Sequence, residues 1–469
     1  MGRIVVIGAG LGAMAAAARL AIAGHAVTVY ERTSTYGGAV GRFERDGFAF
    51  DTGPGLLHLP AVYRDLFVKT GKKPLEECVG LSQVDPAARH VFADGTRVDL
   101  PNASRAGTLA ALDAALGAGA GERWGDFLVR AREAWDRTRR PLLEEPQPAD
   151  PKALAQEPYP ALKPGLLRRP TRTLAQVGER ELRDPRLVAL LDSYAEAYGF
   201  PASAAPASAA VLPYMEQTFG SWYVAGGMRA LADAVYERCR ERRVEFVFGA
   251  EVEGVLEEDG RAVGVRLSGG GTVEADHVVS GAPVPALPHG RPARRHPGGG
   301  TSRVTVCLAL RGSREAGAVH RTVVHAEGGR PTVTVLRPDD PELRPDGDHE
   351  SVTVTATVRT SPGTDWEPFA DRMVEAAERA VPGLADRLLW RHVRTPEDVR
   401  GATGSAEVPG PALADADGGW LPAPNLSPVP GLFLAGGWSH PGGGLAHAGM
   451  SGALVAGLIV EGAEFRGSR

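Results

Sequence analysis

Residues 3–31, RIVVIGAGLGAMAAAARLAIAGHAVTVYE, decide the fold of this chain. A β-branched run at 3–7 predicts a buried strand, and the alanine-rich stretch 14–23 predicts a helix that Gly24 ends. A second apolar run at 26–30 predicts another strand. Because parallel strands are joined through a crossover helix, this unit predicts a doubly wound α/β domain.

The turn between the first strand and the helix, GAGLGA, carries the first functional signal. Gly8, Gly10 and Ala13 occupy the three small positions of the G-x-G-x-x-G/A pattern. The first permits a tight turn, the second lets the backbone approach a pyrophosphate, and the third allows close packing of the helix. Glu31 ends the second strand, where its carboxylate can accept both hydroxyls of an adenosine ribose and repels a 2′-phosphate. The unit therefore predicts dinucleotide binding, with a merely structural turn as the alternative.

Further glycine-rich segments indicate which dinucleotide binds. Gly37 and Gly38 follow the second strand, with Arg42 and the loop DTGP at 51–54 just beyond. At the other end of the chain, residues 431–462 read GLFLAGGWSHPGGGLAHAGMSGALVAGLIVEG. Simple nicotinamide enzymes need neither segment, whereas the ribityl chain and tricyclic ring of FAD extend beyond the first helix and need further backbone contacts. The glycine pattern thus favours FAD.

The composition describes a globular chain with a sizeable core. Of its 469 residues, 43% are hydrophobic and 23% are charged. Glycine and proline, at 60 and 37 residues, make up about a fifth of the chain, below the share typical of low-complexity sequence. The length suggests about three average domains, which two large domains or an interleaved pair also satisfy. The net charge of -5 argues against nucleic acid as a partner.

Cysteine usage and hydropathy point to a cytoplasmic protein. Cys78, Cys239 and Cys307 lie far apart, without C-x-x-C spacing, so we expect no disulfide framework and no metal site. Each cysteine is predicted to be a small buried residue. No stretch approaches the roughly 18 apolar residues that span a bilayer. The strand at 3–7 leaves no room for a signal peptide, so we expect a cytoplasmic location.

The rest of the chain alternates between helical and strand patterns. Residues 56–221 read as helices broken by prolines, with an irregular stretch at 141–170, and suggest a cap or substrate region. Residues 244–280 predict a meander whose turns lie at 259–260 and 269–271. The strands expected in it are 244–248, 252–257, 262–267 and 276–280. A second sheet is expected from strands at 303–310, 332–336 and 351–358 and a helix at 369–380, before a strand at 431–435 and a final helix.

Taken together, these motifs resemble the phytoene desaturase-like flavoproteins, within the larger amine oxidase superfamily. The resemblance rests on VVIGAGLGAMAAAARLAIAGHAVTVYER, on Gly37-Gly38 with FERDGFAFDTGP, on WYVAGGMRAL, on EADHVVSGAP and on FLAGGWSHPGGG, which keep their order over nearly the whole chain. It implies an α/β fold in which a Rossmann-like FAD-binding domain of the glutathione reductase type is interleaved with an α+β substrate domain. The implied FAD domain comprises 1–70, 221–285 and 425–469, and the substrate or cap domain comprises 71–220 and 286–424.

The resemblance also assigns each glycine-rich segment to a part of the cofactor. The implied contacts are Gly8, Gly10, Leu11, Gly12 and Ala13 with the pyrophosphate; Glu31 with the adenosine ribose; Val252 with the adenine; Gly37, Gly38 and Arg42 with the diphosphate and ribityl chain; Gly53 and Pro54 with the flavin ring; Gly436 and Gly437 with phosphate and ribityl; and Ala446, His447, Ala448 and Met450 with the pyrimidine edge. A helix N-terminus at that edge suits the negative charge that reduced flavin carries near N1 and O2. Arg32 is a further expected cofactor contact.

Two positions depart from the family pattern. The family typically has an arginine directly after the Gly-Gly pair, where this chain has Ala39 and offers Arg42 instead. The family also usually has Pro-Gly where this chain has Ala446-His447. His447 is therefore a candidate proton donor or acceptor, or else fills space beside the ring. His440 is a second candidate for acid–base work, with structural capping as the alternative.

Four side chains are candidates for the substrate pocket. His58 follows the GPGLL loop, and Tyr214, Trp222 and Tyr223 precede the Gly-Gly turn of WYVAGGMRAL. The aromatic side chains can line an apolar pocket beside the flavin, and packing in the core explains them equally well. His58 can face the substrate or lie in the core or at the surface.

The resemblance implies an FAD-dependent oxidoreductase that removes hydride from a carbon atom to flavin N5 and creates a new double bond. Saturation and isomerisation also occur in the family. The substrate is a lipophilic or specialised metabolite, or a carotenoid polyene processed at a membrane surface, although residues 103–213 have little of the character that favours membrane docking. An amine oxidase is a further alternative. A flavin-free binding protein resembling the Rab escort factors shares the fold but has no need of the GAGLGA turn with Glu31.

Overall fold

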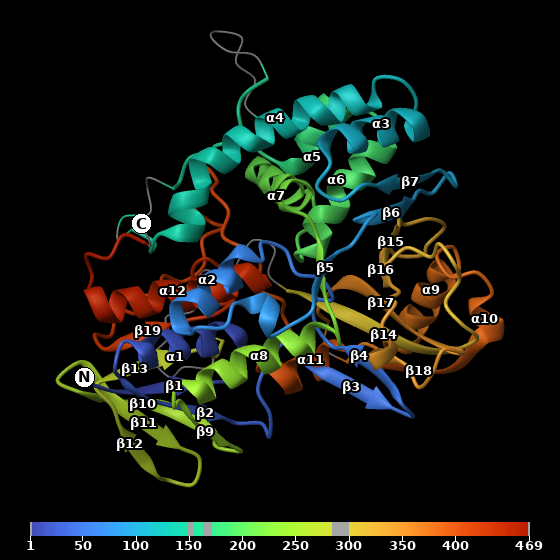
Figure 1. Cartoon of the computed structure of the whole chain (residues 1–469). Helices are drawn as coiled ribbons and strands as arrows, with labels where there is room; N and C mark the ends of the chain where they lie inside the picture. The colour runs from blue at the N-terminus through green and yellow to red at the C-terminus, as the bar shows by residue number, and fades with distance from the viewer. Residues whose placement is uncertain are drawn as a thin grey trace.

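A five-stranded parallel sheet collects strands from distant parts of the chain (Figure 1). The computed structural model describes residues 2–148, 150, 154–162, 171–283, 300–361 and 363–467. In sheet order the strands are β19 (Leu432–Leu434), β13 (His277–Ser280), β1 (Arg3–Ile7), β2 (Ala26–Glu31) and β9 (Glu245–Phe248). All neighbouring pairs are parallel, which confirms the α/β class. Their carboxyl ends therefore share one edge of the sheet.

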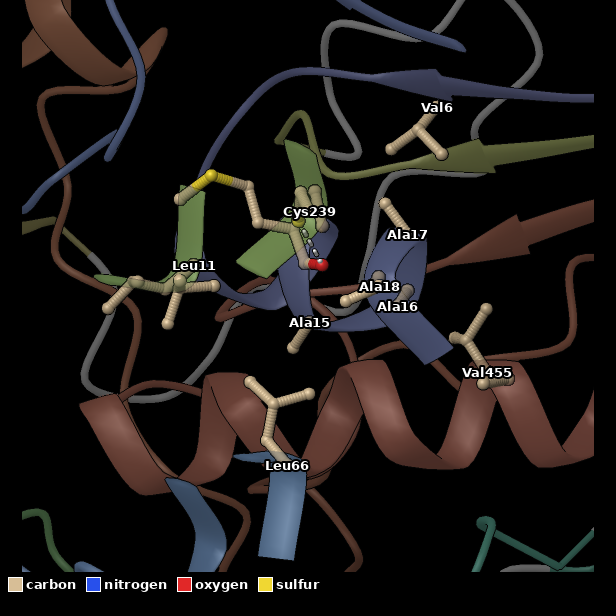
Figure 2. Close-up of a cluster of buried hydrophobic side chains, with 14 of the residues drawn as sticks. Val6, Leu11, Ala15, Ala16, Ala17, Ala18, Leu66, Cys239 and Val455 are labelled. Atoms are coloured by element: carbon tan, nitrogen blue, oxygen red, sulfur yellow. Dashed lines mark hydrogen bonds between the residues drawn. The ribbon is translucent and has the colours of Figure 1, made fainter. Parts of the chain in front are cut away.

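Helix α1 (Leu11–Ile22) lies at the centre of the core beside this sheet. It packs against α2 (Ala61–Thr70), α8 (Met228–Glu241) and α12 (Leu445–Glu461). Its alanines at 15–18 have no exposed surface, and Figure 2 shows them beside Leu66 and Val455. Small side chains on α1 thus let three helices approach it closely.

Two of the three cysteines are buried as predicted. Cys239 reaches α1 and donates its thiol hydrogen to the carbonyl of Met14 over 3.2 Å (Figure 2). Cys307 lies in β14 of the second sheet, also without exposed surface. The prediction was wrong for Cys78, which is exposed because it follows a surface 3-10 turn, Leu75–Glu77.

The crossing of α1 and α12 is the closest helix contact in this core. A Cβ added to Gly12 would lie 2.7 Å from the Cα of Gly436 and 2.8 Å from the carbonyl oxygen of Ala448. A Cβ added to Gly452 would lie 2.5 Å from the carbonyl oxygen of Gly12 and 2.8 Å from the Cβ of Ala15. Since real Cβ atoms do not come this close, the two helices can meet only at glycine.

The predicted meander is smaller than expected. Strands β10 (Val252–Glu258), β11 (Arg261–Leu267) and β12 (Thr272–Glu274) form a three-stranded antiparallel sheet, with turns where they were predicted. The outer two predicted strands exist as β9 and β13 but belong to the parallel sheet. Their apolar residues gave no sign of which sheet they would join.

A seven-stranded sheet forms the second layer. In sheet order it contains β18 (Leu388–Arg394), β14 (Thr301–Arg311), β17 (His349–Arg359), β16 (Val333–Leu336), β15 (Arg321–Val324), β6 (Ala88–Val91) and β7 (Arg97–Leu100). Helix α9 (Glu367–Ala377) covers one face, as predicted, with α10 (Leu384–Arg387) beside it (Figure 1). The prediction missed β6, β7, β15 and β18. Two of these lie in the region expected to be helical, because four-residue strands with charged positions show little alternation.

A layer of helices lies over the other side of this sheet (Figure 1). It consists of α3 (Arg105–Leu116), α4 (Ala120–Arg139), α5 (Leu174–Val177), α6 (Pro185–Ala197) and α7 (Val211–Phe219), with π-helical turns at Arg140–Glu144 and Gly178–Leu182 and a 3-10 turn at Ala207–Ala210. Ser104 and Asp184 cap α3 and α6 through their side chains. Within the predicted irregular stretch, residues 154–162 have no regular structure, while 149, 151–153 and 163–170 lie outside the described residues.

The remaining short elements connect these layers. They are the hairpin of β3 (Arg42–Arg45) and β4 (Phe48–Asp51), the pair of β5 (Leu81–Gln83) and β8 (Trp222–Val224), a 3-10 turn at Pro341–Leu343 and α11 (Pro396–Thr403). None of the described helices is both long and apolar enough to cross a membrane. Across all the residues that the structure describes, no group of three or more His, Cys, Asp or Glu is placed to bind a metal ion.

The crossing of α1 and α12 makes a prediction about stability. We expect Gly452→Ala to lower the free energy of unfolding by about 1–3 kcal/mol, because the added methyl group overlaps α1. Helix propensity alone would act in the opposite direction, by up to about 1 kcal/mol. The measurement is chemical denaturation of both proteins.

Gly401→Ala is the matched control, because Gly401 also lies in a helix and a Cβ there would meet no atom within 4 Å. It should leave stability unchanged or raise it. Equal stability of Gly452→Ala and the wild type would contradict this account of the crossing.

Candidate functional site

Three glycine turns converge at the carboxyl ends of β1 and β2. Gly8 adopts φ +86° and donates its N–H to the carbonyl of Tyr30 over 2.8 Å. The N–H of Gly37 donates to Ala9 over 2.8 Å, and a Cβ on Gly38 would lie 3.1 Å from the Cα of Gly10. The GAGLGA turn and the Gly-Gly segment are therefore in direct contact.

The loop after β4 completes this set of turns. Its Thr52 donates a backbone N–H to Gly41 over 3.0 Å. A Cβ added to Gly53 would overlap the carbonyl of Ala39. Position 53 therefore requires glycine for packing within the protein as well as for any ligand. Pro54 follows in the same loop and is half-buried.

The N-terminus of α1 is open to a ligand. Gly10 is its N-cap and supplies no side-chain hydrogen bond, and a Cβ on Gly10 would meet no atom within 4 Å. The first-turn N–H groups, those of Leu11, Gly12 and Ala13, have no partner within an α-helix. Their donors and the helix dipole favour an anion. Unlike Gly12 and Gly53, Gly10 is not required by any contact within the protein, and its position fits the approach of a pyrophosphate.

Glu31 stands beside this helix end with its carboxylate only 8% exposed. It accepts the N–H of Ala9 over 2.8 Å and the N–H and hydroxyl of Thr33 over 2.8 and 2.9 Å. Each carboxylate oxygen can accept more than one bond, so acceptor capacity remains for hydroxyl groups of a ligand. Arg32 points elsewhere, because its guanidinium binds the carbonyls of Arg400 and Gly401 in α11.

The start of the meander is held beside Glu31. Ala250 donates its N–H to the carbonyl of Glu31, and Gly249 donates to Thr33, each over 2.9 Å. Val252 packs in a small apolar cluster with Tyr30 and Ala282. Its backbone is therefore within the same neighbourhood as the carboxylate that ends β2.

Arg42 and Asp51 fix a different helix end. Asp51 accepts the N–H groups of Met228 and Arg229 over 2.8 and 3.2 Å at the start of α8. Burial raises the pKa of Asp51 to about 6. Arg42 donates to the carbonyl of Gly226 over 3.2 Å, so its guanidinium joins the WYVAGGMRAL turn to the β3–β4 hairpin.

A second helix N-terminus without a side-chain cap lies at α12. Gly444 is its N-cap, with φ +111° and no side-chain cap. Tyr63 holds this end by donating its hydroxyl to the carbonyl of Leu445 over 2.9 Å, a contact that the sequence did not indicate. Because α12 crosses α1 at Gly12, the two uncapped helix ends belong to one region of the molecule.

Buried polar side chains support the segment before α12. Asn425 donates to the carbonyls of Leu434 and His440 over 3.0 and 2.7 Å and to the hydroxyl of Ser451 over 3.1 Å. Ser451 also accepts the N–H of Gly436 over 3.0 Å. A Cβ on Gly437 would lie 2.9 Å from the ring of Pro409, so this segment is fixed from both sides. Neither Asn425 nor Ser451 was singled out by motif reasoning, because a lone polar residue carries no periodic signal.

An apolar cluster covers the first two turns of α12. Its members are Leu59, Val62, Trp135, Leu143, Met215 and Ala446, with Tyr198, Val211, Tyr214 and Met450 packed against them. They come from α2 and the loop before it, from the helical layer and from α12 itself. Tyr214, a predicted pocket residue, is thus brought together with Ala446 and Met450.

His58 lies next to this cluster in a buried polar group. Its Nε2 is 3.6 Å from a carboxylate oxygen of Glu216, and its Nδ1 is 3.4 Å from the carbonyl of Gly220. Arg321 forms an ion pair with the same carboxylate. Burial alone would raise the pKa of Glu216, but the charges of Arg321 and His58 outweigh it and lower that pKa. Burial lowers the pKa of His58.

The other two predicted pocket aromatics are engaged elsewhere. Trp222 donates its indole N–H to the carbonyl of Phe219 over 3.1 Å and lies under the guanidinium of Arg64, 5.2 Å from the ring centroid. Tyr223 donates its hydroxyl to Asp340 over 2.7 Å. Neither is in the apolar cluster: Trp222 packs against the core around α1, and Tyr223 is held by its hydrogen bond to Asp340.

His440 has a structural partner. It has no exposed surface, and its Nε2 lies 2.9 Å from the carbonyl of Glu145, at the end of the π-helical turn that follows α4. Burial lowers the pKa of His440 to about 4, so the ring is neutral at pH 7. This bond ties the C-terminal segment to the helical layer.

His447 lines a small cavity of about 30 Å³ together with Trp135, Leu143, Val211 and Met215, which also belong to the apolar cluster. Burial, and next the charge of His440, lower the pKa of His447 to about 4. The ring is therefore neutral at pH 7 and lies in apolar surroundings. At that pH it has no proton to release as an imidazolium.

The buried position of His447 predicts a pH dependence of stability. In the unfolded chain its pKa is about 6.5, so between pH 6.5 and 4 the unfolded state binds a proton that the folded state excludes. The wild type should therefore lose stability relative to His447→Gln as the pH falls. Between pH 7.5 and pH 5, we expect the unfolding free energy of the wild type to fall on the order of 1–2 kcal/mol more than that of the variant.

Denaturation of both proteins at the two pH values measures this difference. If the two proteins respond identically to pH, His447 is protonated as readily in the folded protein as in the unfolded chain, and its burial is not as described.

Comparison with known proteins gives a consistent result. The family model described as "Flavin containing amine oxidoreductase" matches residues 13–460. The zeta-carotene-forming phytoene desaturase of Myxococcus xanthus is 29% identical, with 99% of this chain and 95% of that protein covered. The hydroxyneurosporene desaturase of Cereibacter sphaeroides is 30% identical, with 98% and 97% covered. The match to the 4,4'-diapolycopene oxygenase of a Methylomonas species is 34% identical but spans 61% of this chain and 56% of that protein.

Solved structures share the fold. An oxidoreductase from Methanosarcina mazei has a TM-score of 0.67 at 18% identity, covering 97% of this chain and 99% of that one. Putrescine oxidase has a TM-score of 0.68 at 16% identity, covering 98% and 99%. At these identities the likeness concerns the fold alone.

Proposed function

Because this chain belongs to the flavin-containing amine oxidoreductase family and is an FAD-dependent oxidoreductase, we propose that it desaturates a lipophilic, polyene-like substrate. When bound, FAD supplies the acceptor for the hydride that leaves the substrate carbon, at N5 of its ring. The observation that carries the proposal is the apolar cluster over the first turns of α12, beside an uncapped helix end. The relatives matched over nearly their whole length are named as desaturases of carotenoids. Nothing in the comparisons supports the flavin-free alternative.

The proposed cofactor site runs between the two uncapped helix ends. We propose that Gly8, Gly10, Leu11, Gly12 and Ala13 surround the pyrophosphate, because Gly10 faces open space. We further propose Glu31 for the ribose and Val252 for the adenine, since hydrogen bonds hold both at the end of β2. The remaining proposed contacts are Gly37, Gly38, Gly53, Pro54, Gly436, Gly437, Ala446, His447, Ala448 and Met450. Arg32 and Arg42 stay predictions, since their guanidinium groups already bind backbone carbonyls.

The division into domains is proposed on the same basis. An FAD domain of 1–70, 221–285 and 425–469 contains every strand of the parallel sheet, and 71–220 with 286–424 contains the seven-stranded sheet and the helical layer. The sheet order supports this division, because no strand of one sheet pairs with a strand of the other among the described residues.

The chain's own residues then have three tasks. The N–H groups at the start of α12 face the charge that develops on the acceptor and stabilise it. The apolar side chains of Leu59, Val62 and Trp135 exclude water from the reacting carbon. His447 is neutral at pH 7 and so adds no positive charge beside the apolar cluster.

The first test concerns the cofactor. Purified protein should be yellow and should release FAD on denaturation. Gly10→Ala should fold with unchanged thermal stability of the apoprotein, because its methyl group meets no protein atom, yet retain at least about tenfold less FAD, because the methyl group blocks the pyrophosphate. The measurements are FAD content per chain and the melting temperature of the apoproteins. A colourless wild type that cannot be reconstituted would contradict the proposal.

The second test concerns the substrate class. The FAD-loaded protein is mixed anaerobically with a hydrocarbon polyene such as phytoene or with putrescine, and the visible absorption band of oxidised flavin is followed. We expect the polyene alone to bleach the band and to gain a conjugated double bond. Bleaching by the amine alone would replace the proposal with an amine oxidase.

A further inference from the structure

Arg303 places a cation on the inner face of the seven-stranded sheet. Along β14, the side chains of Val304, Val306 and Leu308 join the apolar core under α9. Because side chains alternate along a strand, Arg303 and Thr305 face the opposite side, toward the helical layer. That side also bears Thr357, which pairs with Arg303 across the strands. The inner face is therefore polar where the outer face is apolar.

The neighbouring strands continue this polar face. Thr305 pairs with Thr355 in β17, and Thr355 pairs with Thr334 in β16. Thr355 and Thr334 are half-buried, unlike the fully buried valines of the outer face. A β-sheet face in the middle of the chain that bears hydroxyl groups and a guanidinium is unlike the wall of a purely hydrocarbon-binding site.

The guanidinium of Arg303 has no carboxylate partner. It donates to the carbonyl of Ala197 over 2.5 Å, and no acidic side chain of the described chain forms an ion pair with it. Arg321, on the same sheet, pairs with Glu216 instead. Glu196 precedes Ala197, but it lines a groove of about 610 Å³ with Asp192 and Thr332 and forms no ion pair with Arg303 in the described chain. A charge in partly desolvated surroundings normally has a partner, so an unpaired one calls for an explanation.

Arg303 is desolvated but remains accessible. Burial lowers its pKa, and the titratable group that acts against this shift is the phenol of Tyr198. At the same time the side chain is only half-buried by surface area. Part of the guanidinium therefore remains accessible to a ligand. Four of its five N–H donors have no hydrogen-bond partner in the described protein.

Tyr198 connects this cation to the proposed active site. It packs against the apolar cluster that contains Ala446, and a Cβ on Gly444 would lie 3.6 Å from its ring. Burial raises the pKa of its phenol, so the hydroxyl stays protonated and can donate a hydrogen bond. Within the described part of the chain, that hydroxyl has no hydrogen-bond partner. Arg303 and Tyr198 thus offer donors at the edge of the apolar cluster, where the nearby carboxylate of Glu216 is already paired with Arg321.

We propose that Arg303 binds a carboxylate at one end of the substrate, so that the enzyme prefers an amphipathic polyene acid to a pure hydrocarbon. This inference rests on the proposed function. The apolar chain lies along the cluster at α12, and the carboxylate accepts hydrogen bonds from Arg303 with help from Tyr198. Arginine suits this task because its planar donors match the two oxygens of a carboxylate.

The test compares two ligands that differ only in charge, all-trans-retinoic acid and its methyl ester. Each is titrated into the FAD-loaded protein, and binding is followed by quenching of tryptophan fluorescence, since Trp135 lies in the apolar cluster. The wild type should bind the acid about 10- to 100-fold more tightly than the ester, the range expected for hydrogen bonds to a charged group. Arg303→Met should bind both compounds alike, with affinity for the ester unchanged within about twofold.

Arg359→Met is the matched control, because Arg359 is exposed at the end of the adjacent strand β17. It should keep the wild-type preference for the acid. The melting temperature of Arg303→Met should not fall, because the substitution removes an unpaired, half-buried charge, and its FAD content should equal that of the wild type.

Several results would overturn the inference. Equal binding of acid and ester by the wild type, binding of neither, or an unchanged preference in Arg303→Met each contradicts it. Loss of FAD from Arg303→Met would show that the guanidinium serves the cofactor instead. A wild type that carries FAD and is reduced by a hydrocarbon polyene, yet does not prefer the acid, leaves the proposed function intact and removes this inference alone. A colourless wild type removes the proposed function.

Discussion

The contact between α1 and α12 at Gly12, Gly436 and Gly452 is the constraint on which the rest of the structure depends. It brings the last helix of the chain against the first, and so joins two segments separated by more than four hundred residues. Because no side chain separates the helices, their N-termini lie close together at the same side of the parallel sheet. A long dinucleotide needs this arrangement, since one helix end can meet its phosphates while the other meets its ring.

The site follows from this geometry in steps. Glu31 and the three glycine turns are held to one another by backbone hydrogen bonds, whereas Gly10 alone among them faces open space. The polar network around Asn425 fixes the approach to α12. The helical layer then places apolar side chains over the first turns of that helix. Positioning by rigid elements on both sides suits a reaction in which a carbon atom must meet a flat ring closely.

Sequence reasoning succeeded where local pattern and tertiary contact agree. Residues 3–31 contain both strands, the helix and the carboxylate of their unit, so β1, α1 and β2 were predicted with bounds no more than three residues from those observed. It failed where pairing is remote: β6 lies among predicted helices, and its partner β15 lies more than two hundred residues away. The pocket role of Trp222 and Tyr223 stays a prediction, and the directions of their side chains depend on the short strand β8, whose pairing with β5 was not predicted either. Arg303 belongs to no sequence motif. Its proposed role could not be predicted, because that role depends on which side chains surround it in space and on their lacking an acidic partner for it.

The central claim is that one FAD spans the two uncapped helix ends, with its ring against the apolar cluster. A crystal structure of the FAD-loaded protein tests this most directly. The account predicts diphosphate oxygens within hydrogen-bond distance of the N–H groups of Leu11 and Gly12, and the pyrimidine edge of the ring at the first turn of α12, with Ala446 and Met450 beside it. A ring bound away from α12, for example in the groove lined by Asp192 and Glu196, would contradict it.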